Sequence, residues 1–315
     1  MQTTVLRPLG AGELLDRAVT LFVRRFVPIA LVAAAVLVPL LVLQALLTPA
    51  PVDLLALFSR LGTGARPSPA TMRALETANV YGAWITLISM LARLLQWSAL
   101  VAVVAAAYGG VRMSIGAAYR IAAQRWLNQL FVGIQFALIA LLAAIPWFML
   151  YIGLVFALTL TMTVVKALAV VIVVAVVGGL VVVALGAVLT GWLFIAYSLA
   201  SVAVVMEGMH PVTAVTTGLN RAFGAPMRWR SLAAGLVALL LDFGAAIPIV
   251  ALGALLAELT HVQAVYWATV GLGDLLTQCL MATFLVIYAV DVRVRREGID
   301  LLPAAEQGAL GIAAV

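Results

Sequence analysis

Charged residues are scarce in this chain. Only 10% of its 315 residues are Asp, Glu, Lys or Arg, whereas 66% are hydrophobic and the mean hydropathy is +1.21. Soluble domains carry about 25% charged residues, so this composition excludes a soluble enzyme of this length. It predicts an integral membrane protein that crosses the bilayer several times.

Histidine and cysteine are almost absent. His210 and His261 lie far apart in the sequence, and Cys279 has no second cysteine with which to form an internal disulfide. The sequence contains no nucleophile elbow, Walker A loop, H-E-x-x-H motif or C-x-x-C pair. We therefore expect no catalytic residues, no metal site, no cofactor and no enzymatic activity.

Lysine is nearly missing too, since 17 of the 18 basic residues are Arg. This preference, together with the abundance of Ala and Val, is typical of a GC-rich bacterial genome. The net charge of +6 does not indicate a nucleic-acid partner, because membrane proteins collect basic residues on their cytoplasmic side. The predicted partners are the lipid bilayer, with anionic lipids at its cytoplasmic face, and a protein partner of unknown identity.

The arginines are concentrated in four segments. Residues 1–25, 109–128, 207–231 and 291–315 hold 13 of the 18 basic residues. If these segments share one face, that face is the cytoplasm, and an even number of spans separates each from the next. The predicted location is the bacterial plasma (inner) membrane, with both termini cytoplasmic.

The apolar stretch 127–206 determines the topology. It holds a single charge, Lys166, and is too long for one span, which needs about 20 residues. The even count gives it two spans; a three-span alternative would place arginines of the C-terminal half on the opposite face. Two such helices exceed the bilayer thickness, so we expect them to tilt, bend or project, with Pro146 and Gly178-Gly179 as bend points.

The predicted fold is all-α: six transmembrane helices, arranged as three hairpins in one membrane domain. Each hairpin is preceded by a cytoplasmic interfacial amphipathic helix, in which apolar residues recur at helical spacing between charges. The segments are an interfacial helix at 1–25, hairpin 1 at 26–108, an interfacial segment at 109–128, hairpin 2 at 129–206, an interfacial segment at 207–231, hairpin 3 at 232–290 and a cytoplasmic tail at 291–315. Hairpin 1 is expected to contain spans at 26–47 and 82–108, joined by a loop at 48–79 with a short surface helix at 52–61.

A weak internal repeat supports three hairpins. An Arg-aromatic pair precedes each hairpin, and the first helix of each hairpin contains a proline. The pairs are Arg25-Phe26, Arg125-Trp126 and Arg228-Trp229, and the prolines are Pro39, Pro146 and Pro248. The alternative is that such pairs are simply common at membrane interfaces.

Three short motifs carry a family resemblance. They are the run Arg7 to Ala18 followed by Arg24-Arg25-Phe26, Met206-Glu207-Gly208 followed by Asn220-Arg221-Ala222, and the run Tyr288 to Leu301. Together they resemble the glycerophosphodiester phosphodiesterase membrane-domain family. The resemblance implies a six-span bacterial membrane domain that stands alone or is fused to a phosphodiesterase domain. We expect the stand-alone form without phosphodiesterase activity, because the paired histidines and metal-binding carboxylates of that hydrolase have no counterpart here.

Charges at membrane depth are the best candidate binding residues, because they are costly there. Arg93 and Asp274 each lie about 24 Å from the cytoplasmic end of their spans, so we predict that they pair. Asp242, about 16 Å deep, is expected to join them or to face a polar cavity. The candidate polar neighbours are Gln96, Gln135 and Gln278. The alternatives for this group are a packing salt bridge, a substrate or ion site, or snorkelling of Arg93 to the outer interface.

A second group of charges lies on the cytoplasmic side. We predict a carboxylate–guanidinium network that joins the interfacial segments or, alternatively, simple charge balance at helix ends. Its members are Glu13, Asp16, Arg17, Glu207, Arg221, Asp291, Arg293, Arg295, Arg296 and Glu297.

Two functions are the main candidates at this point; a third, an intramembrane enzyme, would need a clustered acid, base or metal site that the sequence does not provide. The first is a non-catalytic scaffold or regulatory subunit at the inner face of the membrane, whose basic belt binds anionic lipid and a partner. The second is a small-molecule or lipid transporter that uses Arg93, Asp242 and Asp274, since broken helices, repeats and buried charges are common in transporters. A polar, water-accessible cavity around these charges would favour the second function, and a dry centre would favour the first.

Overall fold

The computed structural model describes residues 9–47, 69–165, 168–225, 227–260 and 262–297. These residues form eight α-helices, one π-helical turn and no strands. The helices are α1 (Ala11–Arg24), α2 (Phe26–Leu47), α4 (Pro69–Tyr108), α5 (Ile115–Leu160), α6 (Leu168–Glu207), α7 (Pro211–Phe223), α8 (Arg228–Thr260) and α9 (Gln263–Glu297).

Six of these helices, α2, α4, α5, α6, α8 and α9, are long and apolar enough to cross a membrane. The apolar part of α4, Gly82–Tyr108, coincides with the predicted second span. The prediction of an all-α, multi-pass membrane protein is confirmed.

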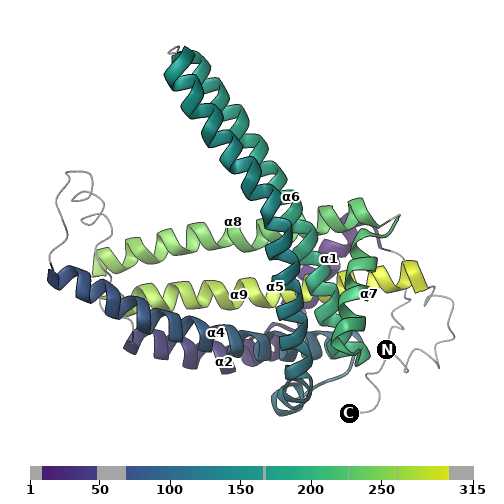
Figure 1. Ribbon diagram of the computed structural model, residues 1–315. Coiled ribbons are helices and arrows are strands. Elements are labelled where there is room, and N and C mark those ends of the chain that lie inside the picture. Colours follow the sequence, from purple (N-terminus) through teal and green to yellow (C-terminus); the bar gives the residue numbers. More distant parts are fainter. Residues whose placement is uncertain (1–8, 48–68, 166–167, 226, 261, 298–315) are drawn as a thin grey trace.

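Four of the long helices lie side by side, and the other two project from them. In Figure 1, α2, α4, α8 and α9 run in the same general direction, whereas α5 and α6 form a hairpin that crosses one end of this group and extends away from it. We call the end where α1 and α7 lie the terminal end, and the end near Leu47 and Thr260 the loop end.

The four arginine-rich segments meet at the terminal end. The backbone N–H of Leu9 donates to Asp291 in the last turns of α9, and Glu207 at the end of α6 forms ion pairs with Arg221 and Arg293. The side chain of Arg125 lies against Gly208. Each hairpin therefore starts and finishes at the same end, which confirms two spans, rather than three, in 127–206.

The core lies towards the terminal end and uses small residues. The buried cluster includes Ala99–Ala105 of α4, much of α6 from Ile195 to Val205 and most of α9 from Cys279 to Val292. A Cβ atom on Gly218 would lie 2.5 Å from the carbonyl oxygen of Ala196, and one on Gly235 would collide with the backbone of Gly191. Small side chains let helix backbones approach closely in membrane proteins.

Two predicted segment boundaries are wrong. Residues 69–79 were expected to be loop but belong to α4, because Pro69 is compatible with the first turn of a helix and no further Pro or Gly follows before Gly82. Residues 115–128 are not a separate interfacial helix but the start of α5, which is capped by the side chain of Ser114. The remaining loop residues 48–68 and the predicted surface helix at 52–61 lie outside the described residues.

The hairpin formed by α5 and α6 has an apolar outer half, residues 138–160 and 168–190, which we call the arm. The two helices contain 46 and 40 residues, or about 69 and 60 Å, roughly twice the hydrocarbon core. Pro146 and Gly178-Gly179 lie inside uninterrupted α-helix, and the departure from α-helical geometry is the π-helical turn Thr161–Val165. The arm projects from the other four long helices (Figure 1), which was one of the three predicted possibilities: tilting, bending or projecting.

Candidate functional site

An ion pair lies at membrane depth between α4 and α9. Arg93 Nη2 is 2.6 Å from Asp274 Oδ2, so the predicted pair is confirmed. Arg93 is about 16 Å from Gly82, where the apolar part of α4 begins, and Asp274 is about 15 Å from Ala264, where that of α9 begins. Both residues therefore lie at similar depth from the loop end.

The carboxylate of Asp274 has a second partner on its own helix. Gln278, one turn later in α9, donates from Nε2 to Asp274 Oδ1 at 2.8 Å. Both carboxylate oxygens of Asp274 thus accept hydrogen bonds from neighbouring side chains. The side chain of Arg93 is nevertheless 48% exposed and that of Asp274 is 26% exposed, so the pair borders open space.

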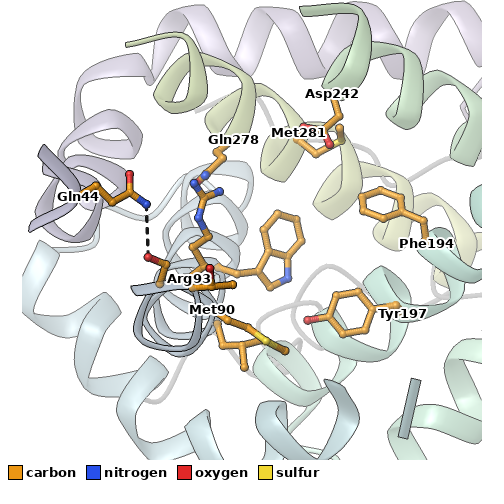
Figure 2. Close-up of a pocket in the computed structure, with 12 residues that line it drawn as sticks. Gln44, Met90, Arg93, Phe194, Tyr197, Asp242, Gln278 and Met281 are labelled. Carbon is orange, nitrogen blue, oxygen red and sulfur yellow. Dashed lines mark hydrogen bonds between the residues drawn. The ribbon is translucent and has the colours of Figure 1, made fainter. Parts of the chain in front are cut away.

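That space is a cavity of about 580 Å³ between α2, α4, α6, α8 and α9. Its polar lining residues are Gln44, Thr86, Ser89, Arg93, Asp242 and Gln278. Its apolar and aromatic lining residues are Met90, Leu94, Trp97, Phe194, Tyr197 and Met281. Figure 2 shows these side chains arranged around the cavity, with Gln44 bonded to Ser89 at one side and Asp242 near Met281 at another. A volume of this size lies within the range of small-molecule pockets.

Asp242 of α8 faces this cavity. The sequence predicted that Asp242 either joins the Arg93–Asp274 pair or faces a polar cavity, and the structure shows the second arrangement. Asp242 is exposed and lies close enough to Arg93 and Asp274 for electrostatic interaction with both. Among the described residues, it has no hydrogen-bond or ion-pair partner. Arg93, Asp242 and Gln278 therefore share one cavity, and Asp242 is the member that the surrounding side chains leave unsatisfied.

Gln96 does not belong to the cavity, so that prediction is wrong. Its side chain is almost fully buried and donates to the backbone carbonyl of Ala33 in α2 at 2.9 Å. Gln96 is three residues after Arg93, which turns it about 60° around the helix. That rotation is enough to direct it between α4 and α2. Gln135, another predicted neighbour, is also absent from the lining.

Sequence reasoning missed several lining residues. Trp97 follows Arg93 by four residues and therefore lies on the same helix face, which was a usable signal. Gln44 and Ser89 are polar residues within apolar spans, and this polarity could also have identified them as candidates. Phe194 and Tyr197 could not have been found, because nothing in the sequence shows which face of α6 turns towards α4 and α8.

At the terminal end, Glu207 is the centre of a buried ion cluster. Its two carboxylate oxygens accept from Arg221 Nη1 and Nη2 at 2.7 and 3.0 Å, and Arg293 Nε lies 3.6 Å away. The side chains of Arg221 and Glu207 are 6% and 12% exposed. This cluster joins the end of α6 to α7 and α9.

Asp291 is the centre of a second cluster at the same end. Its side chain is fully buried and lies 3.0 Å from Arg230 Nη2 of α8 and 3.1 Å from Arg295 Nε. Asp291 Oδ1 also accepts from the backbone N–H of Leu9 at 2.7 Å, while both arginines donate to the Leu9 carbonyl. The segment before α1 is thereby fastened to α8 and α9.

The rest of the predicted network is only partly joined to these clusters. Glu13 and Arg17 pair with each other along α1 at 3.0 Å, and Arg296 donates to the backbone of Asn220. Asp16 is exposed and has no ion-pair partner among the described residues. The side chain of Glu297 lies outside the described part of the structure.

Comparisons with protein-family models, with curated proteins and with solved structures find no match for this chain. Within the described residues, no group of three or more His, Cys, Asp or Glu side chains is placed to hold a metal ion. The arrangement that remains is an ion pair, one unsatisfied carboxylate and an aromatic lining within a cavity among membrane-spanning helices. Such a site can bind a small molecule through charge and apolar contact.

Proposed function

We propose that this multi-pass membrane protein binds small amphiphilic molecules in the cavity next to Arg93 and transports them. The observation that carries the proposal is that Arg93, the ion-pair partner of Asp274, is half-exposed and lines a cavity of about 580 Å³. A salt bridge that served packing alone would be enclosed by side chains, because charge at membrane depth is costly unless it is paired, hydrated or functional. Here Arg93 and Asp242 line a space large enough for a ligand.

A scaffold function is the second candidate, and the charged residues at the terminal end are the relevant evidence. The clusters around Glu207 and Asp291 are buried and mutually satisfied, so they join helices rather than present charge to a partner. Other arginines at this end are exposed, and they suit anionic lipid headgroups. These are Arg24, Arg112, Arg120 and Arg228.

The orientation of the protein in the membrane and its bacterial origin are part of the same proposal. We place the terminal end, and with it both chain termini, in the cytoplasm, because arginine concentrates on that side of membrane proteins. The membrane is then the bacterial plasma membrane. The resemblance to the glycerophosphodiester phosphodiesterase membrane-domain family agrees with a stand-alone bacterial membrane domain, and the proposal assigns no catalysis to it.

The test is cysteine accessibility in intact cells, on a Cys279→Ser background. Asp242→Cys should react with a membrane-impermeant thiol reagent, because Asp242 is exposed and lines the cavity. Ala238→Cys is the matched control: it lies one turn earlier on α8 and is fully buried, so it should not react. Glu258→Cys, exposed near the loop end, shows that the reagent reaches that side.

Labelling at positions 242 and 258 but not at 238 would support a water-accessible binding cavity. If the Asp242→Cys variant stays unreactive even to a small permeant reagent while the Glu258→Cys variant reacts, the cavity is closed in the membrane. The transport proposal then fails and the scaffold function becomes the better one.

A further inference from the structure

The charges around the cavity do not balance. One guanidinium, Arg93, interacts electrostatically with two carboxylates, Asp242 in the lining and Asp274 beside it, and Arg93 is the only basic residue of the lining within the described part of the chain. When all three groups are charged, together they carry a formal charge of −1. An occupant with one positive charge would neutralise it.

The hydrogen bonds show where that positive charge would lie. Each carboxylate oxygen of Asp274 already accepts a hydrogen bond, one from Arg93 and one from Gln278, so the charges of Arg93 and Asp274 offset each other. The carboxylate of Asp242 is the acceptor that described residues leave open. An anionic ligand would meet a guanidinium whose charge Asp274 already offsets, and the carboxylate of Asp242 in the lining would repel it.

The remaining lining suits an organic cation better than a metal ion. Hard metal cations require several oxygen ligands, whereas this cavity presents aromatic rings from Trp97, Phe194 and Tyr197. Aromatic faces stabilise organic cations by cation–π attraction. In Figure 2 the ring of Tyr197 directs its hydroxyl towards the centre of the cavity, with Phe194 next to it.

Two of these rings are held in place by other residues. Trp97 Nε1 donates to Ser201 Oγ at 2.8 Å, and the ring of Tyr197 packs edge-on against Phe136, with ring centroids 5.6 Å apart. A preorganised aromatic wall binds a ligand without losing side-chain freedom. Met90, Leu94 and Met281 complete an apolar surface that favours a ligand with hydrocarbon groups.

We infer that the ligand of this cavity is a lipophilic organic cation, whose charge is bound by Asp242 and whose apolar groups contact the aromatic wall. This inference rests on the proposed binding function and specifies its substrate class. It distinguishes the roles of the two charged partners: Asp242 binds the cation directly, whereas Arg93 keeps Asp274 from contributing a second negative charge.

The experiment compares two ions of nearly the same shape and opposite charge. Saturable binding of radiolabelled tetraphenylphosphonium and of tetraphenylborate is measured with the full-length protein in lipid nanodiscs, with empty nanodiscs as the partition control. We expect saturable binding of the cation and none of the anion. Asp242→Asn should weaken cation binding at least tenfold, and Arg93→Gln should strengthen it, because Asp274 then faces the cavity unpaired.

A second pair of variants tests the aromatic wall. Phe194→Leu keeps an apolar side chain but loses the ring face, so it should weaken cation binding several-fold. Phe243→Leu is the matched control, because Phe243 adjoins Asp242 in sequence but is exposed and does not line the cavity. Gel filtration and thermal unfolding of each variant show whether it is folded.

The outcomes separate the two levels of the proposal. Preferred binding of tetraphenylborate, lost in Arg93→Gln, would overturn the cation inference but keep a ligand site in the cavity. Equal binding of cation by the folded Asp242→Asn variant would also overturn it. If neither ion binds saturably, the inference fails, and cysteine labelling at position 242 then decides whether the proposed function fails with it.

Discussion

Two ion pairs in this protein have nearly the same length and very different surroundings. Arg221 and Glu207 lie 2.7 Å apart at the terminal end, and Arg93 and Asp274 lie 2.6 Å apart at membrane depth. The first pair is almost completely enclosed, whereas the arginine of the second is half-exposed. Distance alone therefore does not distinguish an enclosed pair from one that lies beside a cavity. The space around each pair does.

The same contrast extends over the two ends of the bundle. At the terminal end, the helices pack through alanines and glycines, and the backbone of Leu9 is tied to α8 and α9. Towards the loop end, α2, α4, α6, α8 and α9 leave the cavity between them. The terminal end is thus closely packed, whereas the other leaves the space in which we propose that a ligand binds.

Removal of the buried carboxylate of Asp291 should have the largest effect on stability. Asp291→Ala leaves Arg230 and Arg295 without their shared carboxylate and the Leu9 N–H without an acceptor, which should cost about 3–5 kcal/mol. The measurement is the yield and thermal unfolding of the purified protein. Asp16→Ala is the control and should change the stability by less than about 0.5 kcal/mol, because Asp16 is exposed. Equal effects of the two variants would remove the contrast between buried and exposed charge.

A methyl group at the closest helix crossing should have the next largest effect. The Cβ atom of Gly235→Ala would collide with the backbone of Gly191 in α6, and overpacking of this kind costs about 1–3 kcal/mol. On the same helix, a Cβ atom on Gly244 would meet no atom within 4 Å. Gly244→Ala should therefore unfold at the same temperature as the parent protein or higher. A stable Gly235→Ala variant would mean that α6 and α8 are not tightly packed.

The cavity pair should have the smallest effect on stability. Because Arg93 is half-exposed and lines a cavity that water can enter, removal of either partner should cost less than the roughly 3–5 kcal/mol expected for Asp291, while ligand binding changes. Thermal unfolding of Arg93→Ala, Asp274→Ala and the double variant provides the comparison. If a single variant loses as much stability as Asp291→Ala and the double variant regains it, the pair is a packing device and the contrast between the two ends is wrong.

The sequence predicted the arrangement along the membrane normal better than the arrangement around each helix. Counting residues to the ends of the spans placed Arg93 and Asp274 at matching depth, and the structure contains the ion pair that this depth predicted. Gln96 has nearly the same depth as Arg93, but its direction depends on the position of α2, and it packs against Ala33 instead. Depth follows from the 1.5 Å rise per residue, whereas direction requires knowledge of the neighbouring helices.

The path of the α5–α6 hairpin shows the same limit. The distribution of arginines gave the correct number of spans, and Pro39, Pro146 and Pro248 each lie inside the first helix of a hairpin, as the repeat predicted. The repeat nevertheless fails at the start of the second hairpin, where no proline or glycine separates an interfacial helix from α5. The direction of the arm could not be predicted, because its residues are apolar on every side.

The position of α9 has a consequence for biosynthesis. Its span is the most buried of the six candidates, and it contacts α1, α2, α4 and α8, yet it is the last of the six to leave the ribosome. Until then, α2 and α4 lack their central neighbour, and the Leu9 N–H lacks Asp291, which lies 282 residues later in the chain. The early hairpins must therefore remain incompletely packed in the membrane until α9 has been synthesised.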